Sequence, residues 1–232
     1  MKLALIGDIH GNDLALKAVL EAASAANVDR LLVTGDLVGY YFSPLQVLDL
    51  LSGWDRDVVR GNHEEMLSKA QNDFAYLAKV TARYGSGVRV AIDQLNSKQL
   101  DELCALPHPL ELDIDGVRVL LCHGAPWNLD QYIYPDADPG LTARCAPENY
   151  DLVVMGHTHY PMLKRIGKTA VVNPGSVGQP RDRKPGACWA LFDTEDQMIE
   201  LRRESYDSSD LVRECQLRHP VLPYLSEVLQ ST

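Results

Sequence analysis

Five short runs of this chain contain the residue types that bind divalent metal ions. They lie between residues 8 and 159, and they hold five of the seven histidines. In chain order the runs are Asp8-Ile9-His10, Gly35-Asp36, Gly61-Asn62-His63-Glu64, Cys122-His123-Gly124 and Gly156-His157-Thr158-His159. Their nitrogen and oxygen donors are Asp8, His10, Asp36, Asn62, His123, His157 and His159. This set is large enough for two adjacent metal ions, and it predicts the hydrolysis of a phosphate ester.

The donors are carboxylates, imidazoles and one amide oxygen, without a thiolate. This mixture favours borderline or hard divalent transition-metal ions, namely Mn²⁺, Fe²⁺, Zn²⁺, Co²⁺ or Ni²⁺. Two such ions can share a hydroxide, lower its pKa towards neutrality and clamp the phosphoryl oxygens during its attack. A shared site needs a bridging carboxylate, and Asp36 is the natural candidate. We therefore expect a dimetal phosphoesterase that uses a metal-bridged hydroxide.

Each run follows a short apolar stretch that predicts a buried strand. These stretches are residues 3–6, 31–34, 58–59, 117–122 and 152–155. Ligands of open α/β sheets bind beyond the carboxyl ends of the strands, so distant runs can converge at one edge. Successive side chains of a strand point to opposite sides, so Asp8 and His10 reach one site only if the chain turns after Ile6. Gly7 and Gly11 are expected to permit that turn.

Further elements are predicted between and after these strands. They are a helix at 13–26, capped by Asn12 or Asp13, and strands at 112–114, 170–172, 187–192 and 199–203. Asp115-Gly116 predicts a tight hairpin between the strands at 112–114 and 117–122. Helices separate the early strands, whereas the last two strands should pair antiparallel. The architecture should therefore be mixed α/β, with strands from both halves of the chain.

Two segments lie outside this pattern of strands. Residues 64–109 are predicted to form a helical, lid-like insertion, in which Asn96 and Gln99 offer a capping box. Residues 208–232 contain two short helical stretches separated by prolines, and we expect them to have a packing role. Because no linker divides the chain, residues 1–232 are predicted to form a single domain.

Composition limits the partners and the compartment. The net charge of −10 and the lack of a basic run disfavour nucleic acid, whereas a small anionic substrate held by metals needs no basic surface. The five cysteines are odd in number and scattered, which is typical of free thiols in a reducing compartment. The apolar run near the amino terminus is too short for a signal peptide, and no segment approaches membrane length. We expect a cytoplasmic protein without a membrane partner.

The five runs resemble, in order, the D-x-H, G-D, G-N-H-E, H and G-H-x-H signature of the calcineurin-like metallophosphoesterases. Residues 124–126, 156–161 and 173–182 resemble the bacterial and archaeal branch that includes small phosphodiesterases and diadenosine-polyphosphate hydrolases. The resemblance implies a four-layer αββα sandwich of two mixed β-sheets flanked by helices. It implies that Asp8, His10, Asp36 and His159 bind one metal ion, while Asp36, Asn62, His123 and His157 bind the other.

By the same resemblance, His63 is the general acid that protonates the leaving oxygen, and Arg60 holds the substrate phosphate. An imidazole titrates near neutral pH, and a guanidinium fork matches a phosphate. The protein Ser/Thr phosphatases carry an Asp-Arg pair after Gly-Asp, where this chain has Gly39-Tyr40. Because that pair would orient His63 and supply a second arginine, its absence favours a diester or nucleotide substrate over a phosphoprotein.

Other side chains near the runs are candidates either for substrate contact or for packing. Besides Arg60, the candidate substrate contacts are Asn62, Tyr40 with its neighbours Tyr41 and Phe42, and Arg181. The aromatic side chains can stack on a nucleobase. Trp127, Tyr132 and Tyr134 follow His123 and either line the same cleft or pack. His108 and His219 adjoin prolines and are expected to be loop histidines without a metal role.

Three alternatives to a phosphodiesterase or a dinucleoside polyphosphate hydrolase are kept open. The first is a phosphomonoesterase with the same mechanism. The second is a non-catalytic interaction module, because a retromer subunit uses this type of fold as a scaffold. The third is a nuclease, which the acidic charge disfavours. The sequence specifies neither the natural substrate nor the metal ion. It also leaves the oligomeric state open, including a homo-oligomer.

Overall fold

The computed structural model describes residues 1–230 and contains two five-stranded sheets. The first sheet has the strand order β10-β9-β1-β2-β3. Its strands are β1 (Lys2–Ile6), β2 (Arg30–Val33), β3 (Arg56–Val58), β9 (Ala187–Asp193) and β10 (Ile199–Glu204). Strands β1, β2 and β3 are parallel, whereas β9 pairs antiparallel with both β1 and β10. Strands from both halves of the chain therefore share one sheet, as predicted.

The second sheet has the strand order β4-β5-β6-β8-β7. Its strands are β4 (Leu110–Ile114), β5 (Val117–Leu121), β6 (Leu152–Val154), β7 (Met162–Ile166) and β8 (Thr169–Asn173). The predicted hairpin between β4 and β5 is present, and Asp115 and Gly116 both have the positive φ that such a turn requires. Strand β7 was not predicted, because Lys164 and Arg165 interrupt its apolar residues. It lies at an edge of the sheet and pairs only with β8.

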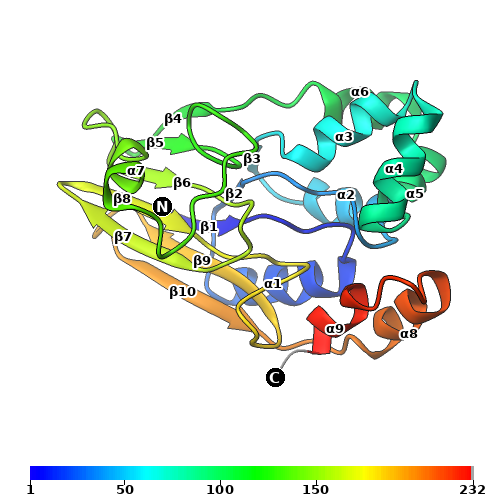
Figure 1. Cartoon of the computed structure of the whole chain (residues 1–232). Coiled ribbons are helices and arrows are strands. Elements are labelled where there is room, and N and C mark those ends of the chain that lie inside the picture. Colours follow the sequence, from blue (N-terminus) through cyan, green and yellow to red (C-terminus); the bar gives the residue numbers. More distant parts are fainter. Residues whose placement is uncertain (231–232) are drawn as a thin grey trace.

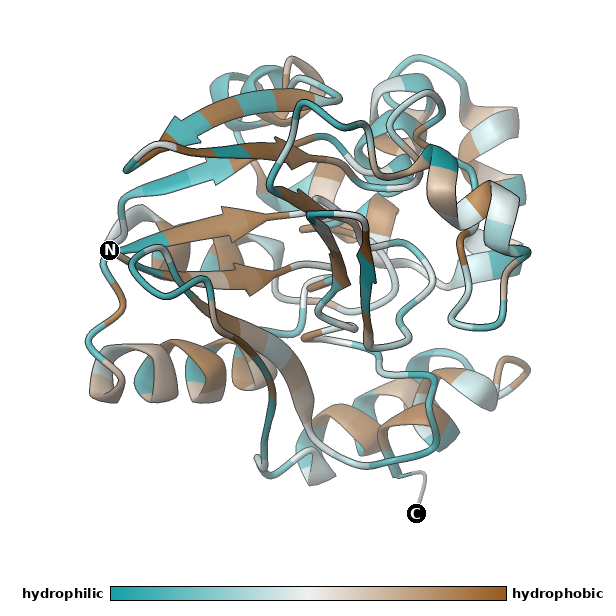
Figure 2. Cartoon of the chain, turned by 90° about the vertical axis from the view of Figure 1, so that its left-hand side faces the viewer, coloured by the Kyte–Doolittle hydropathy of each residue, from teal (hydrophilic) through white to brown (hydrophobic). Residues whose placement is uncertain are grey.

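The two sheets pack face to face and share a core (Figures 1 and 2). Leu3 and Leu5 point from β1 into this core, whereas Ala4 and Ile6 face the helices on the other side of the sheet. Burial of both faces explains why the β1 sequence is entirely apolar after Lys2. Figure 2 shows hydrophobic residues along the strands of both sheets.

Helices cover the outer faces of both sheets. Helices α1 (Asp13–Ala25) and α2 (Pro44–Ser52) pack against the first sheet, and Asn12 caps α1 through its side chain. The outer face of the second sheet is covered by buried residues around α7 (Pro139–Arg144) and the loop before it. The predicted four-layer arrangement of two mixed sheets flanked by helices is confirmed, although the layer beside the second sheet is thin.

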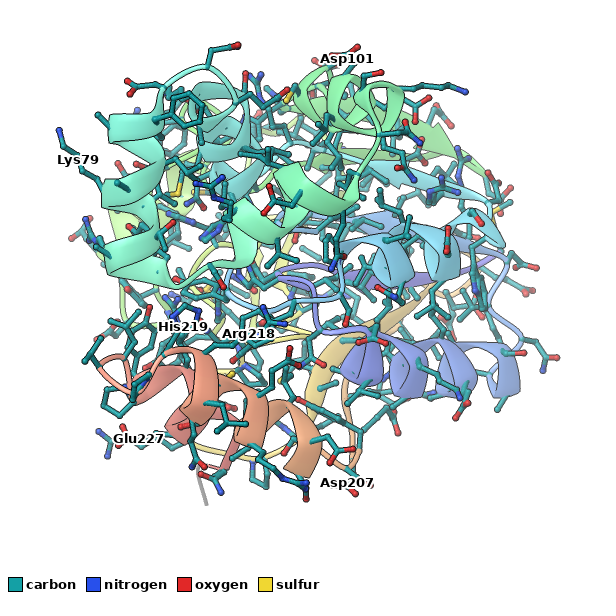
Figure 3. The ribbon with its side chains drawn as sticks, turned by 90° about the vertical axis from the view of Figure 1, so that its right-hand side faces the viewer. Lys79, Asp101, Asp207, Arg218, His219 and Glu227 are labelled. Atoms are coloured by element: carbon teal, nitrogen blue, oxygen red, sulfur yellow. The ribbon has the colours of Figure 1, made fainter. Side chains whose placement is uncertain are left out.

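The remaining helices form two groups that face each other beside the sheets. The first group is α3 (Asn62–Ala70), α4 (Phe74–Tyr84), α5 (Gly87–Gln94) and α6 (Ser97–Cys104), and the second is α8 (Ser209–Arg218) and α9 (Tyr224–Gln230). The capping box of Asn96 and Gln99 is formed. Figure 3 shows Arg218 and His219 at the boundary between the groups.

The carboxy-terminal helices pack as the sequence predicted. Leu211, Val212 and Leu225 form a buried cluster with Tyr41 and Phe42. Residues 231 and 232, which belong to the predicted tail, lie outside the described part of the chain. Within residues 1–230, no helix combines the length and the apolarity that crossing a membrane requires.

Candidate functional site

The loops after the strands turn sharply at the candidate metal ligands themselves. Asp8, His10, Asp36, His157 and His159 all have positive φ, between 50° and 67°. This conformation is uncommon for residues other than glycine and costs about 1–3 kcal/mol each. The positive φ angles turn side chains two positions apart, such as those of Asp8 and His10, towards the same site. The expected turn after β1 therefore occurs, but it depends on the ligands as well as on glycine.

Gly7 and Gly11 contribute in two different ways. Gly11 has a φ of 71° and takes part in the turn, as expected. Gly7 does not have positive φ, so its contribution to the turn is not its backbone conformation. Its lack of a side chain provides space instead, because a Cβ atom there would lie 1.7 Å from Thr34 Oγ1.

A buried carboxylate fixes the loops that carry these ligands. Glu64 is fully buried, and its oxygens accept hydrogen bonds from the backbone N–H groups of Asp36, Leu37, Val38 and Gly61, at 2.8–3.3 Å. Glu64 therefore ties the loop after β2 to the start of α3. Glu64 belongs to the Gly61-Asn62-His63-Glu64 run, but no role was predicted for it from the sequence. The available signal was its position in the first turn of a helix, where acidic residues satisfy free N–H groups.

The first group of candidate ligands contains Asp8, His10, Asp36 and His159, whose ligand atoms lie within 4.8 Å of one another. His10 Nδ1 lies 3.2 Å from Val38 O, and His159 Nδ1 lies 2.6 Å from Gln179 O. A carbonyl accepts a hydrogen bond, so each Nδ1 carries the proton and each Nε2 has a free lone pair. The two Nε2 atoms face each other at 3.1 Å. A cation satisfies both lone pairs, whereas a hydrogen bond between two neutral rings in this tautomer cannot.

The second group contains Asp36, His123 and His157. His123 Nδ1 lies 2.8 Å from Thr34 O, which again leaves Nε2 without a proton. That atom lies 3.1 Å from His157 Nδ1 and 2.9 Å from Asn62 Oδ1. His157 Nε2 has no hydrogen-bond partner among the described residues, and an oxygen of Asp130 lies 3.5 Å from it. His123 Nε2, His157 Nδ1 and a carboxylate oxygen of Asp36 therefore converge, and the Asn62 oxygen completes the group.

Asp36 belongs to both groups. Its Oδ2 atom lies 3.6 Å from His10 Nε2 and 3.5 Å from His123 Nε2, while Oδ1 accepts a hydrogen bond from the backbone of His63. Burial raises the pKa of Asp36 well above its usual value, and the carboxylates of Glu64 and Asp8 raise it further. Divalent cations would offset both effects.

The imidazoles also have the chemical form that a metal ion requires. Burial lowers the pKa values of His10, His123 and His159 well below the usual value, so these rings are neutral near pH 7. A neutral imidazole with a protonated Nδ1 and a free Nε2 is a common metal ligand, held in orientation by its carbonyl partner. The residues present therefore fit two divalent metal ions.

His63 lies beside the first group in an aromatic environment. Its ring centroid is 4.7 Å from that of His10 and 4.8 Å from that of Tyr40. Its Nδ1 atom is buried without a hydrogen-bond partner among the described residues. A Cβ atom at residue 39 would lie 1.9 Å from that nitrogen, so Gly39 leaves the ring its space. Burial lowers the pKa of His63 to about 3, and an anionic phosphate beside the ring would raise it.

The structure brings Arg181 and Tyr40 to the site. Arg181 Nη2 donates to the Tyr40 hydroxyl at 2.9 Å and to Gln179 Oε1 at 3.0 Å. The Arg181 guanidinium carbon lies 5.9 Å from the centroid of the Tyr40 ring, and the Arg181 backbone N–H donates to His159 O at 3.4 Å. After burial, the charge of Arg181 contributes to the lowered pKa values of His63 and His159. Arg60 has its contacts elsewhere, because its Nη1 donates to Cys104 O at 3.4 Å. The structure therefore places the Arg181 side chain against Tyr40 beside the metal ligands, whereas the Arg60 side chain contacts Cys104.

The aromatic candidates and the remaining histidines occupy different environments. Tyr132 lies against the ligand His157, with ring centroids 3.9 Å apart, and Tyr134 stacks on Tyr132. The Trp127 ring packs instead under Arg144. His219 Nε2 contacts Ser86. Burial, with a smaller contribution from the charge of Arg60, lowers the pKa of His108 to about 4. Neither of these two histidines belongs to the ligand groups.

Comparisons with known proteins agree with this geometry. The calcineurin-like phosphoesterase superfamily domain matches residues 1–197. An uncharacterized protein of Methanocaldococcus jannaschii is 33% identical over 224 residues, which cover 88% of each chain. The Escherichia coli phosphodiesterase YfcE is 26% identical over 84% of this chain and 89% of its own.

A solved structure shows the same architecture. The metallophosphoesterase from Sphaerobacter thermophilus has a TM-score of 0.80 and 27% sequence identity, and the comparison covers 100% of this chain and 98% of that one. The motifs, the two sheets and the buried ligand groups all agree with the domain match over residues 1–197. The chain is therefore a member of the calcineurin-like phosphoesterase superfamily, the metal-dependent phosphoric ester hydrolases.

Proposed function

We propose that this protein hydrolyses small phosphodiesters or nucleotide polyphosphates with two divalent transition-metal ions. The ions would be held by Asp8, His10, Asp36, Asn62, His123, His157 and His159. The observation that carries the proposal is the pair of facing histidine nitrogens in each group, 3.1 Å apart in both, with the Asp36 carboxylate between the groups.

The chemistry is the transfer of a phosphoryl group to water. Two bound ions would lower the pKa of a water molecule and neutralise the phosphoryl oxygens. The water oxygen forms a bond to phosphorus, and the bond between phosphorus and the leaving oxygen breaks. We assign to His63 the proton that the leaving oxygen takes up, because its ring lies beside the ligand His10. We assign to Arg181 and Tyr40 the orientation of the phosphate, while a role for Arg60 stays a prediction.

The residues beside His63 support a diester or a nucleotide as the substrate. Gly39-Tyr40 stands where the protein phosphatases have an Asp-Arg pair, so the arginine of that pair is missing. The guanidinium that contacts Tyr40 at the site is that of Arg181. A phosphodiester carries one negative charge, whereas a phosphomonoester carries nearly two. The YfcE relative is named a phosphodiesterase. A phosphomonoesterase with the same residues is the nearest alternative.

The role of the helical insertion and the cellular compartment also belong to this proposal. We assign residues 64–109 the role of a lid over the site, because Asn62 and His63 begin α3, the helix that leads into this segment. We also place the protein in the cytoplasm, since all five of its cysteines are free thiols and free thiols are typical of reducing compartments.

A substrate panel tests the proposed function. Purified protein loaded with Mn²⁺ is expected to hydrolyse bis(p-nitrophenyl) phosphate and at least one dinucleoside polyphosphate faster than phosphomonoesters. Release of p-nitrophenolate and of free nucleotide provides the measurement. A preference for monoesters would support the alternative, and a complete lack of hydrolysis with bound metal would contradict the proposal. A stable protein partner for such an inert protein would then indicate an interaction module.

A further inference from the structure

We infer that a pocket beside the metal ligands binds the nucleotide part of the substrate, as a nucleoside with two or more phosphate groups. This inference rests on the proposed function and specifies its substrate class. The pocket has a volume of about 480 Å³, and its lining includes Tyr40, Arg83, Tyr84, Arg181, Arg183 and Tyr224. That volume lies within the range of small-molecule sites, roughly 300–1,000 Å³.

Two side chains that line the pocket, those of Tyr40 and Arg181, also belong to residues that adjoin the metal ligands. The Tyr40 ring lies edge-on to the ligand His10, with centroids 4.6 Å apart. Arg181 Nη2 donates to the Tyr40 hydroxyl at 2.9 Å, and the Arg181 backbone N–H donates to the carbonyl oxygen of the ligand His159 at 3.4 Å. A phosphate at the ligand groups and a second phosphate in the pocket can therefore belong to one molecule, with Arg181 between them.

Three tyrosines form the aromatic part of the pocket. The rings of Tyr84 and Tyr224 both stand edge-on to Tyr40, at 5.8 and 6.4 Å and an interplanar angle of 89°. The Tyr224 hydroxyl donates to Arg83 O at 2.8 Å and so ties α9 to the end of α4. Tyr224 remains 37% exposed, which leaves part of its ring free for a ligand. Aromatic faces of this kind stack on nucleobases regardless of the base.

Three arginines form the charged part of the pocket. Arg83 lies at the end of α4, whereas Arg181 and Arg183 belong to the loop after β8. Their concentration is unusual in a chain with a net charge of −10, although Glu227 also lines the pocket. A guanidinium group binds phosphate in a fixed, bidentate geometry, so three of them suit a chain of phosphates. Inorganic phosphate would leave the tyrosines unused, and a neutral aryl ester would leave the arginines unused.

One wall of the pocket comes from outside the family domain. The match to the superfamily ends at residue 197, whereas α9 supplies Tyr224 from the segment beyond it. The expected packing role of this segment is therefore only part of its contribution. Substrate recognition by α9 would be specific to those members of the superfamily that carry such a segment.

Binding of two non-hydrolysable ligands to the Mn²⁺-loaded protein tests this inference. The first ligand is α,β-methylene-ADP, and the second is methylenediphosphonate, which has the same bridged phosphorus groups without the nucleoside. Calorimetry is expected to show that the wild-type protein binds the nucleotide analogue at least about tenfold more tightly. Arg83→Gln and Arg183→Gln should each weaken binding of that analogue by about tenfold. Arg89→Gln, on α5 outside the pocket lining, is the matched control and should not change it.

A tyrosine substitution separates the base from the phosphates. Tyr224→Leu should remove the preference for the nucleotide analogue, whereas Tyr224→Phe, which keeps the ring, should retain most of it. If the leucine variant fails to fold, the two arginine variants carry the test. Equal affinity of the wild-type protein for both ligands would overturn the inference, and so would arginine variants that bind like Arg89→Gln.

Turnover of bis(p-nitrophenyl) phosphate by the same preparations distinguishes the two proposals. Turnover without a preference for the nucleotide analogue would overturn the pocket assignment and support the proposed function. A preference that depends on Tyr224, together with nucleotide binding that depends on Arg83 and Arg183, in a protein without turnover, would support the pocket and overturn the proposed hydrolysis.

Discussion

Replacement of Asp36 by Asn is expected to lower phosphodiester hydrolysis by at least about a hundredfold and metal binding from about two ions per chain to one or fewer. Asp36 Oδ2 lies about equally far from a histidine nitrogen of each ligand group, at 3.6 and 3.5 Å. An amide keeps the shape of the side chain but removes the negative charge and leaves one oxygen to serve both groups. Metal content by mass spectrometry and the hydrolysis rate are measured on the same samples.

A matched control separates this effect from a general loss of acidic charge. Asp113→Asn changes an exposed carboxylate whose oxygen accepts a hydrogen bond from Gly116, and asparagine can keep that contact. This variant should retain the wild-type metal content and rate. Wild-type activity in Asp36→Asn would contradict the bridging assignment.

Replacement of His63 by Ala is expected to reduce the rate by about 10² to 10⁴ for substrates with poor leaving groups, such as alkyl esters. An alkoxide cannot leave without a proton, whereas p-nitrophenolate is stable enough to need much less help. The loss should therefore shrink as the leaving group becomes more acidic. Rates for a series of phenyl and alkyl diesters, plotted against the pKa of the leaving alcohol or phenol, provide the measurement.

The same series shows what kind of role His63 has. A steeper dependence on leaving-group pKa in the variant supports proton donation. A loss of equal size for every ester would contradict it and indicate that the ring only orients the site. His108→Ala is the control, because the His108 side chain lies outside both ligand groups. It should behave like the wild-type protein with every ester.

The ligand set could be predicted from the sequence because its signals are local. Each run follows an apolar strand, and parallel strands place their carboxyl ends at one edge of a sheet. Asp8 and Asp36 meet for this reason, because they follow β1 and β2 of the first sheet. His123 follows β5 of the second sheet and meets them because the two sheets pack face to face, which the pattern of strands alone did not predict. Strand β7 was missed because an edge strand is exposed on one face and therefore tolerates charges such as Lys164 and Arg165.

The less local features of the site were not predictable in this way. The contact of Tyr224 with Arg83 joins residues 141 positions apart, and neither residue lies in a motif. Arg181 contacts Tyr40 and Arg60 contacts Cys104 because of how two loops fold back, so the guanidinium beside Tyr40 could not be chosen by residue type alone. The positive φ values at Asp8 and His10 result from tertiary hydrogen bonds to the loop after β2, as in the contact of His10 N with Asp36 O.

The most direct test of the dimetal site is a titration of metal-free protein with Mn²⁺ while bis(p-nitrophenyl) phosphate hydrolysis is followed. We expect no significant rate without metal, a rise as the ions bind and a plateau at about two equivalents per chain. Full activity of the metal-free protein, or saturation with Mn²⁺ without any hydrolysis, would contradict a dimetal phosphoesterase.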